Sequence, residues 1–80
     1  MTYLFIYDES YVEIEAKSFK EAVRNFLEYC GDLSGAAELA LKGAETEEDF
    51  DVIIEHFSTH SVEKIYQVGR PLFDADGMKY

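Results

Sequence analysis

Two histidines stand four residues apart, His56 and His60, a spacing that would put both imidazoles on one face of a helix. A zinc site needs at least a third ligand, and Cys30 is the chain's only thiol. The metalloprotease order His-Glu-x-x-His is absent, because the run reads His-Phe-Ser-Thr-His. Polar residues 58–61 are typical of a helix end, where an imidazole interacts favourably with the helix dipole. We therefore expect helix-end residues and no bound metal.

Other reactive groups also lack the neighbours that chemistry requires. Cys30 falls on an apolar helical stripe, which predicts a buried small side chain rather than an activated thiolate. Asp74-Ala75-Asp76-Gly77 resembles the opening of a calcium loop, but only three residues follow, so a turn is expected. Neither a glycine-rich phosphate loop nor a serine-nucleophile motif occurs. The sequence thus predicts no catalytic residue and no cofactor, so we expect a protein that is not an enzyme.

A run of acidic residues forms the first candidate binding surface. Residues 43–63 contain no Lys or Arg and seven acids: Glu45, Glu47, Glu48, Asp49, Asp51, Glu55 and Glu63. The apolar residues of this run recur at helical spacing and must face inward, so the acids spread over the outer surface. Closely spaced carboxylates on a rigid helix can imitate phosphates. The alternative is a solvated helix face whose first turn carries acids that favour the dipole.

A tyrosine-rich strand face forms the second candidate. If Leu4, Ile6, Val12 and Ile14 point into the core, then Tyr3, Phe5, Tyr7 and Tyr11 stand on the opposite face, beside Glu13 and Glu15. Tyrosine is enriched at the centres of protein interfaces. Sheets that stack RNA bases carry Lys or Arg, whereas these strands carry glutamate, so binding of a protein or self-association is favoured. The alternatives are a core on the other side of the sheet and an aromatic ladder that only stabilises it.

The elements that would position these residues follow from hydrophobic periodicity. Strands are expected at 2–7 and 11–16, joined by a loop at 8–10, and at 62–68, with an edge strand near 72–73 and a possible turn at 74–77. Helices are expected after the capping residues Ser18 and Thr46, and a shorter one lies within 32–43. Gly31 is expected to end the first helix.

This order is β-β-α-α-α-β, and it predicts one α+β domain over 1–80. We expect a three- or four-stranded antiparallel sheet with two to three helices on one face. A third strand beside the first would make the first strand central.

Composition bounds the choice of partner. The 80 residues include 17 acids and 7 bases, for a net charge of −10. Nucleic acid and anionic membranes would be repelled, and a protein partner with a basic surface would be attracted. One cysteine excludes an intrachain disulfide and fits a reducing cytoplasm. No signal peptide or membrane-spanning run is found. The alternative is that acidity only keeps a small protein soluble.

These whole-chain properties resemble the small acidic proteins of bacteriophages and mobile elements, among them anti-CRISPR proteins. The run 11–22, in which a strand leads directly into a capped helix, is similar to segments common in such proteins. The resemblance implies a phage-encoded inhibitor that binds a bacterial defence ribonucleoprotein stoichiometrically, at a positively charged nucleic-acid channel. Two other classes stay open. One is an immunity or antitoxin protein that neutralises a basic nuclease toxin, and the other is a small structural or oligomerisation domain with incidental acidity.

Overall fold

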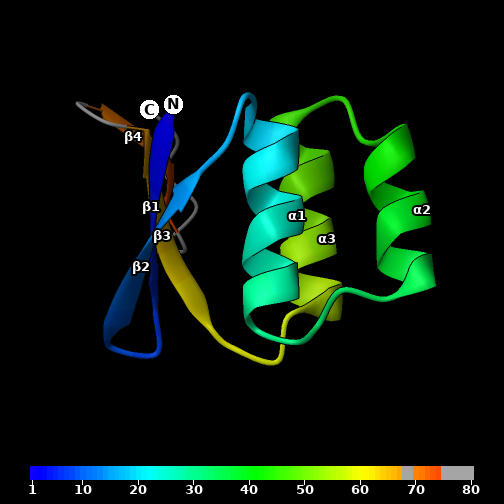
Figure 1. Ribbon diagram of the computed structural model, residues 1–80, viewed down its shortest axis with the longest axis horizontal. Coiled ribbons are helices and arrows are strands. Elements are labelled where there is room, and N and C mark those ends of the chain that lie inside the picture. The colour runs from blue at the N-terminus through cyan, green and yellow to red at the C-terminus, as the bar shows by residue number, and fades with distance from the viewer. Residues whose placement is uncertain (68–69, 75–80) are drawn as a thin grey trace.

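The helices and the strands occupy separate layers. The computed structural model describes residues 1–67 and 70–74, the latter only as a strand of the sheet. All three helices lie on one side of the sheet, with α1 and α3 next to it and α2 outside them as a further layer (Figure 1). Along the chain the elements are β1 (Thr2–Tyr7), β2 (Ser10–Glu15), α1 (Phe19–Tyr29), α2 (Gly35–Gly43), α3 (Glu47–Phe57), β3 (Val62–Gln67) and β4 (Arg70–Asp74). The predicted α+β order is confirmed.

The sheet is antiparallel, and its first strand is central. The strand order is β2-β1-β3-β4, so β1 pairs with β2 on one side and with β3 on the other. Phe5 lies opposite both Val12 and Ile65. The expected edge strand near residues 72–73 is present as β4, which pairs with β3. The expected turn at 74–77 and the residues after it lie outside the described residues.

The predicted assignment of faces in the first hairpin is wrong for β1. A three-residue loop was expected at 8–10, but Ser10 pairs with Tyr7, and only Asp8 and Glu9 form the turn. Their φ angles are 46° and 64°, as a two-residue hairpin turn with both central residues left-handed requires. Because side chains alternate between the two faces of a sheet, a loop shorter by one residue shifts the pairing of β1 with β2 by one residue. Each β1 side chain then lies on the same face as a different set of β2 side chains than was expected. Tyr3, Phe5 and Tyr7 therefore share the helix side with Val12 and Ile14, as their pairing shows.

The core forms between this corrected face and the helices. Phe5 is 0% exposed and Tyr3 only 2% exposed. The Phe5 ring stacks on Phe26 of α1, with centroids 4.4 Å apart and planes within 4°. Tyr7 meets the edge of the same Phe26 ring at 5.3 Å. Leu4 and Ile6 consequently lie on the side of the sheet away from the helices, where Tyr11, Glu13 and Glu15 also lie.

Each helix begins at a hydroxyl cap, as predicted for α1 and α3. Ser18, Ser34 and Thr46 accept the backbone N–H three residues on, at 3.2, 3.1 and 3.2 Å. After α1, Gly31 adopts φ of 77° and donates to Glu28 O, while Asp32 N–H donates to Leu27 O. These two bonds form a Schellman motif, which needs a left-handed residue at the glycine position. The helix boundaries are therefore set locally, before any tertiary packing.

Glu9 carries a cost in the hairpin turn, because a side chain in the left-handed region loses about 1 kcal/mol relative to glycine. We expect Glu9→Gly to raise the free energy of unfolding by about 0.5–1 kcal/mol, measured by urea denaturation. Glu13→Gly, an exposed strand position with extended backbone, is the control and should lower it by about the same amount. Destabilisation by both changes would contradict the assigned turn.

Candidate functional site

The outer surface of α3 carries the acidic candidate site. Phe50, Ile53 and Ile54 are buried, while Val52 is 64% exposed. At 3.6 residues per turn, Glu48 and Glu55 point away from the buried stripe, one turn before and one turn after Val52 along the helix. Glu45, Glu47 and Glu63 are also exposed, and Asp51 is half-buried. The helix therefore presents its carboxylates from a fixed backbone, as expected from the sequence.

Asp49 differs from the other acids of this run. Its Oδ2 accepts hydrogen bonds from the N–H groups of Glu45 (2.9 Å) and Thr46 (3.0 Å), which with the Thr46 cap completes a capping box. The bond from Glu45, followed by that from Thr46, holds the pKa of this carboxyl below its usual value. Asp49 thus caps the start of α3, and its carboxylate binds backbone N–H groups of the same chain.

The second candidate surface is divided by the corrected register. Tyr11 is 70% exposed, and Glu13 and Glu15 stand with it on the side away from the helices. Tyr7 lies on the other side, half-buried between Phe26 and His60, which it meets edge-on at 5.3 Å. The structure therefore does not bring Tyr7 and Tyr11 together. In place of Tyr3, Phe5 and Tyr7, the outer face contains Leu4 and Ile6, which sequence reasoning had placed in the core.

Glu15 is held at the rim of this outer face. Its Oε2 accepts a 2.6 Å hydrogen bond from the Thr2 hydroxyl, and its Oε1 lies 3.1 Å from the Met1 amino group. The Thr2 bond, then the amino group, lowers the pKa of the Glu15 carboxyl. Glu15 is an ionised edge residue whose carboxylate has partners inside the chain, although its side chain is 74% exposed.

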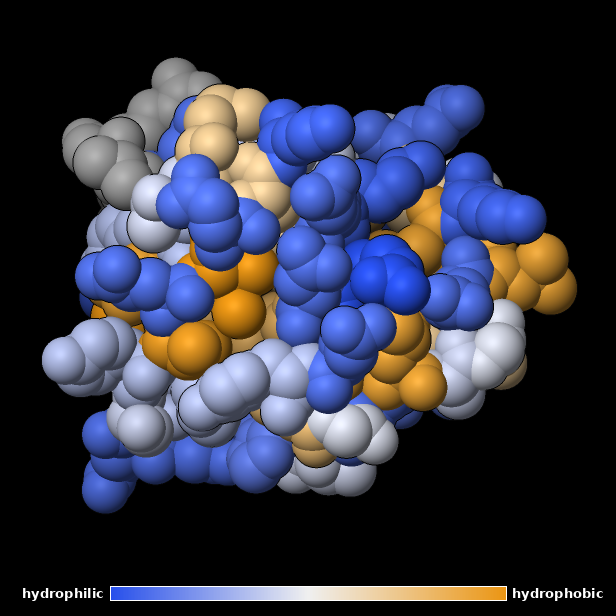
Figure 2. Space-filling view, viewed as in Figure 1, coloured by the Kyte–Doolittle hydropathy of each residue, from blue (hydrophilic) through white to orange (hydrophobic). Residues whose placement is uncertain are grey.

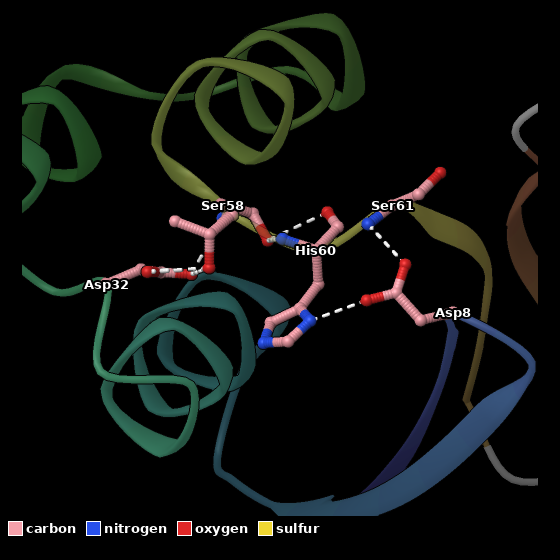
Figure 3. A network of polar contacts seen from close by, with 6 residues as sticks. Asp8, Asp32, Ser58, His60 and Ser61 are labelled. Carbon is pink, nitrogen blue, oxygen red and sulfur yellow. Dashed lines mark hydrogen bonds and ion pairs between the residues drawn. The ribbon is translucent and has the colours of Figure 1, made fainter.

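His60 belongs to a polar network rather than to a helix end. Since α3 ends at Phe57, His56 and His60 do not share a helix face. Asp8 in the hairpin turn faces the His60 Nδ1 and accepts the Ser61 N–H at 2.9 Å (Figure 3). Nearby, Asp32 accepts the Thr59 N–H at 2.8 Å. Two carboxylates thus fasten the α3–β3 connection to the β1–β2 turn and to the end of α1.

Cys30 is half-buried beside the core at the end of α1. Burial, and then the charges of Asp32 and Asp8, raise the pKa of its thiol. A raised pKa disfavours the thiolate, the form that attacks electrophiles or binds metal. Within residues 1–67 and 70–74, no three His, Cys, Asp or Glu side chains are grouped so as to hold a metal ion. None of the helices in that part of the chain is long and apolar enough to cross a membrane.

The network predicts a pH dependence of stability. Asp8 forms hydrogen bonds with the His60 side chain and with the Ser61 N–H. The bond with His60, followed by that with Ser61, holds the pKa of the Asp8 carboxyl below its ordinary value. A depressed folded-state pKa contributes stability above the unfolded value of about 3.9, and this contribution is lost as pH falls through the folded-state pKa. We therefore expect Asp8→Asn, which keeps the shape, to unfold more easily than the parent at pH 7 and to differ less from it at about pH 3. Denaturant unfolding at both pH values checks this. A gap of equal size at both would show that the charge of Asp8 contributes nothing.

Comparison of the chain with protein-family models, with curated proteins and with solved structures finds no match.

Proposed function

We propose that the protein is a non-enzymatic inhibitor that binds a basic site on another macromolecule stoichiometrically, through the outer surface of α3. One observation carries this proposal: residues 43–63 hold seven acids and no Lys or Arg, and the buried stripe of α3 turns Glu48 and Glu55 outward. Glu45 and Glu47 extend the same charged surface at the start of the helix.

The fixed backbone of α3 supports a binding role for this array over that of a solvated helix face. The capping box fixes the beginning of α3, and Phe50, Ile53 and Ile54 anchor its length in the core. The helix fixes where these side chains leave the backbone, so only the side chains, and not the main chain, have to be ordered when Lys and Arg groups meet the carboxylates. A preformed array of negative charge competes with phosphates for the same cations.

The chemistry of the partner follows from the charge. A net charge of −10 attracts a basic surface, and the likeness to anti-CRISPR proteins favours the nucleic-acid channel of a bacterial defence complex. Such channels hold their nucleic acid through the backbone, and the contacts are Lys and Arg side chains. The single cysteine suits action in the reducing cytoplasm of a host cell.

The test is the double charge reversal Glu48→Lys with Glu55→Lys. Purified RNA-guided effector complexes are assayed for target-DNA binding with increasing amounts of the protein. The parent should abolish binding at about one equivalent, and the reversed variant should need well over tenfold more, because each lost contact becomes a repulsion. Inhibition should also weaken as salt shortens the screening length from about 10 Å at 0.1 M to about 3 Å at 1 M. Stability should change by only a few tenths of a kcal/mol, since exposed helix charges contribute little.

The matched control is Glu21→Lys with Glu28→Lys, which makes the same change in net charge on α1, away from both candidate surfaces. If both pairs weaken inhibition equally, net charge rather than the α3 array is responsible. If Tyr11→Ala abolishes inhibition while the α3 reversals and salt do little, the outer sheet face is the contact and phosphate imitation is the wrong mechanism.

A second expectation concerns nucleic acid itself. Because 17 acids outnumber 7 bases, the protein should not bind DNA or RNA. Shift assays with single- and double-stranded oligonucleotides at about 150 mM salt should show no complex below micromolar concentrations. Sub-micromolar binding of any oligonucleotide would overturn the proposed mode of action.

A further inference from the structure

Side chains of β2, β1 and β3 lie on the side of the sheet away from the helices. The register places Leu4 between Glu13 and Tyr66, and Ile6 between Tyr11 and Lys64. With Thr2 and Glu15 at one end, these eight residues are called the outer sheet face. All three helices lie on the opposite side (Figure 1).

The central strand is apolar on both sides. Tyr3 and Phe5 are buried against the helices, and Leu4 and Ile6 point the other way. A strand of an antiparallel sheet with one solvated side normally alternates apolar with polar residues, whereas a strand covered on both sides is apolar throughout. Leu4 and Ile6 are only partly buried by their neighbours. Beside Tyr11 and Glu13 they line a shallow hollow of about 330 Å³, which also reaches Glu9 and Ser10.

The charge of this face differs from that of the whole chain. Its eight residues include two carboxylates, Glu13 and Glu15, and one ammonium, Lys64. The Met1 amino group lies 3.1 Å from Glu15, and Asp74 of β4 lies opposite Lys64 in the register, so the local charge stays far smaller than the −10 of the whole chain. A strongly basic partner would gain little from so nearly balanced a surface. Two copies of the face, in contrast, can approach each other without strong local repulsion.

The hollow and Tyr66 also occupy positions on the sheet that a two-fold axis can exchange. The hollow lies over β1 and β2, and Tyr66 stands on β3, on the other side of Leu4. A two-fold axis running along β1 exchanges these two sides, because it places β3 of one copy over β2 of the other. We propose that the protein forms a symmetric dimer through the outer sheet face, with Tyr66 of each copy filling the hollow of the other.

In this dimer the partner's Tyr66 ring rests on Leu4 and Ile6, and its hydroxyl lies near Glu13. Two sheets packed face to face are the ordinary arrangement of a β-sandwich, and they bury the apolar side of each central strand. The α3 helices stay on the outside of the assembly, since they lie on the far side of each sheet (Figure 1). The dimer therefore does not depend on the inhibitory role proposed for α3.

Sedimentation velocity over roughly 5–200 µM tests the proposal. The parent should sediment as a dimer at the upper end, and raising salt from about 0.1 to 0.5 M should tighten it, because salt screens the repulsion between two chains of like charge. Tyr66→Ala should weaken association at least thirtyfold, as loss of a central aromatic anchor does, and Tyr66→Phe should preserve it. Ile6→Glu should abolish it by placing an unpaired charge at the centre.

The control is Leu39→Glu, which adds the same charge elsewhere. Leu39 is 72% exposed, about half a turn around α2 from the buried Ala37 and Leu41. Figure 2 shows hydrophobic atoms at the edge of the molecule where α2 lies. Circular dichroism should show all four variants folded, and Tyr66→Phe against Tyr66→Ala remains decisive if Ile6→Glu does not fold. A parent that stays monomeric at every concentration and salt would overturn the dimer. So would dissociation by Leu39→Glu with Tyr66→Ala unaffected, which would move the contact to α2.

Discussion

The stacking of Phe5 on Phe26 joins the central strand to the first helix, and the remaining elements are arranged around this contact. Phe5 also lies opposite Val12 and Ile65, so one residue touches the helix layer and both neighbouring strands. In a chain of 80 residues the core is small, and the buried residues that the structure describes form a single cluster. With Phe5 buried against α1, the alternation along β1 turns Leu4 to the other side of the sheet.

The helices were predictable because their signals are local. Ser18, Ser34 and Thr46 cap the three helices, and Gly31 ends α1 with φ of 77°. The faces of β1 were not predictable, because they depend on whether two or three residues form the turn. The favoured two-residue turn contains glycine or asparagine, and the pair Asp8-Glu9 gives no such signal. The partners of Asp8 complete the explanation: His60 and Ser61 bind its carboxylate from more than fifty residues away.

The sequence predicts that acidic residues gather on this surface, but it does not predict which hydrogen bonds each acidic side chain makes. Seven acids in one base-free stretch are visible in the sequence, and the buried stripe of α3 tells which way they point. The Asp49 carboxylate accepts hydrogen bonds from the N–H groups of Glu45 and Thr46. This contact depends on the side-chain conformation at the start of the helix, which the sequence does not specify. Tyr7 lies on the helix side of the sheet for the same reason that Phe5 is in the core: the two-residue turn sets the register of β1 against β2.

The place of β1 at the centre of the sheet has a consequence for biosynthesis. Phe5 of β1 pairs with Ile65 of β3, so β1 is synthesised sixty residues before this pairing partner. At about 5–20 residues per second, a ribosome needs roughly 3–12 seconds to supply that partner. During this interval the nascent chain can form the first hairpin and α1, but one edge of β1 keeps unpaired N–H and C=O groups beside apolar side chains. Such an edge is a template for wrong pairing. The nascent polypeptide is therefore most exposed to aggregation and to chaperones just before β3 emerges.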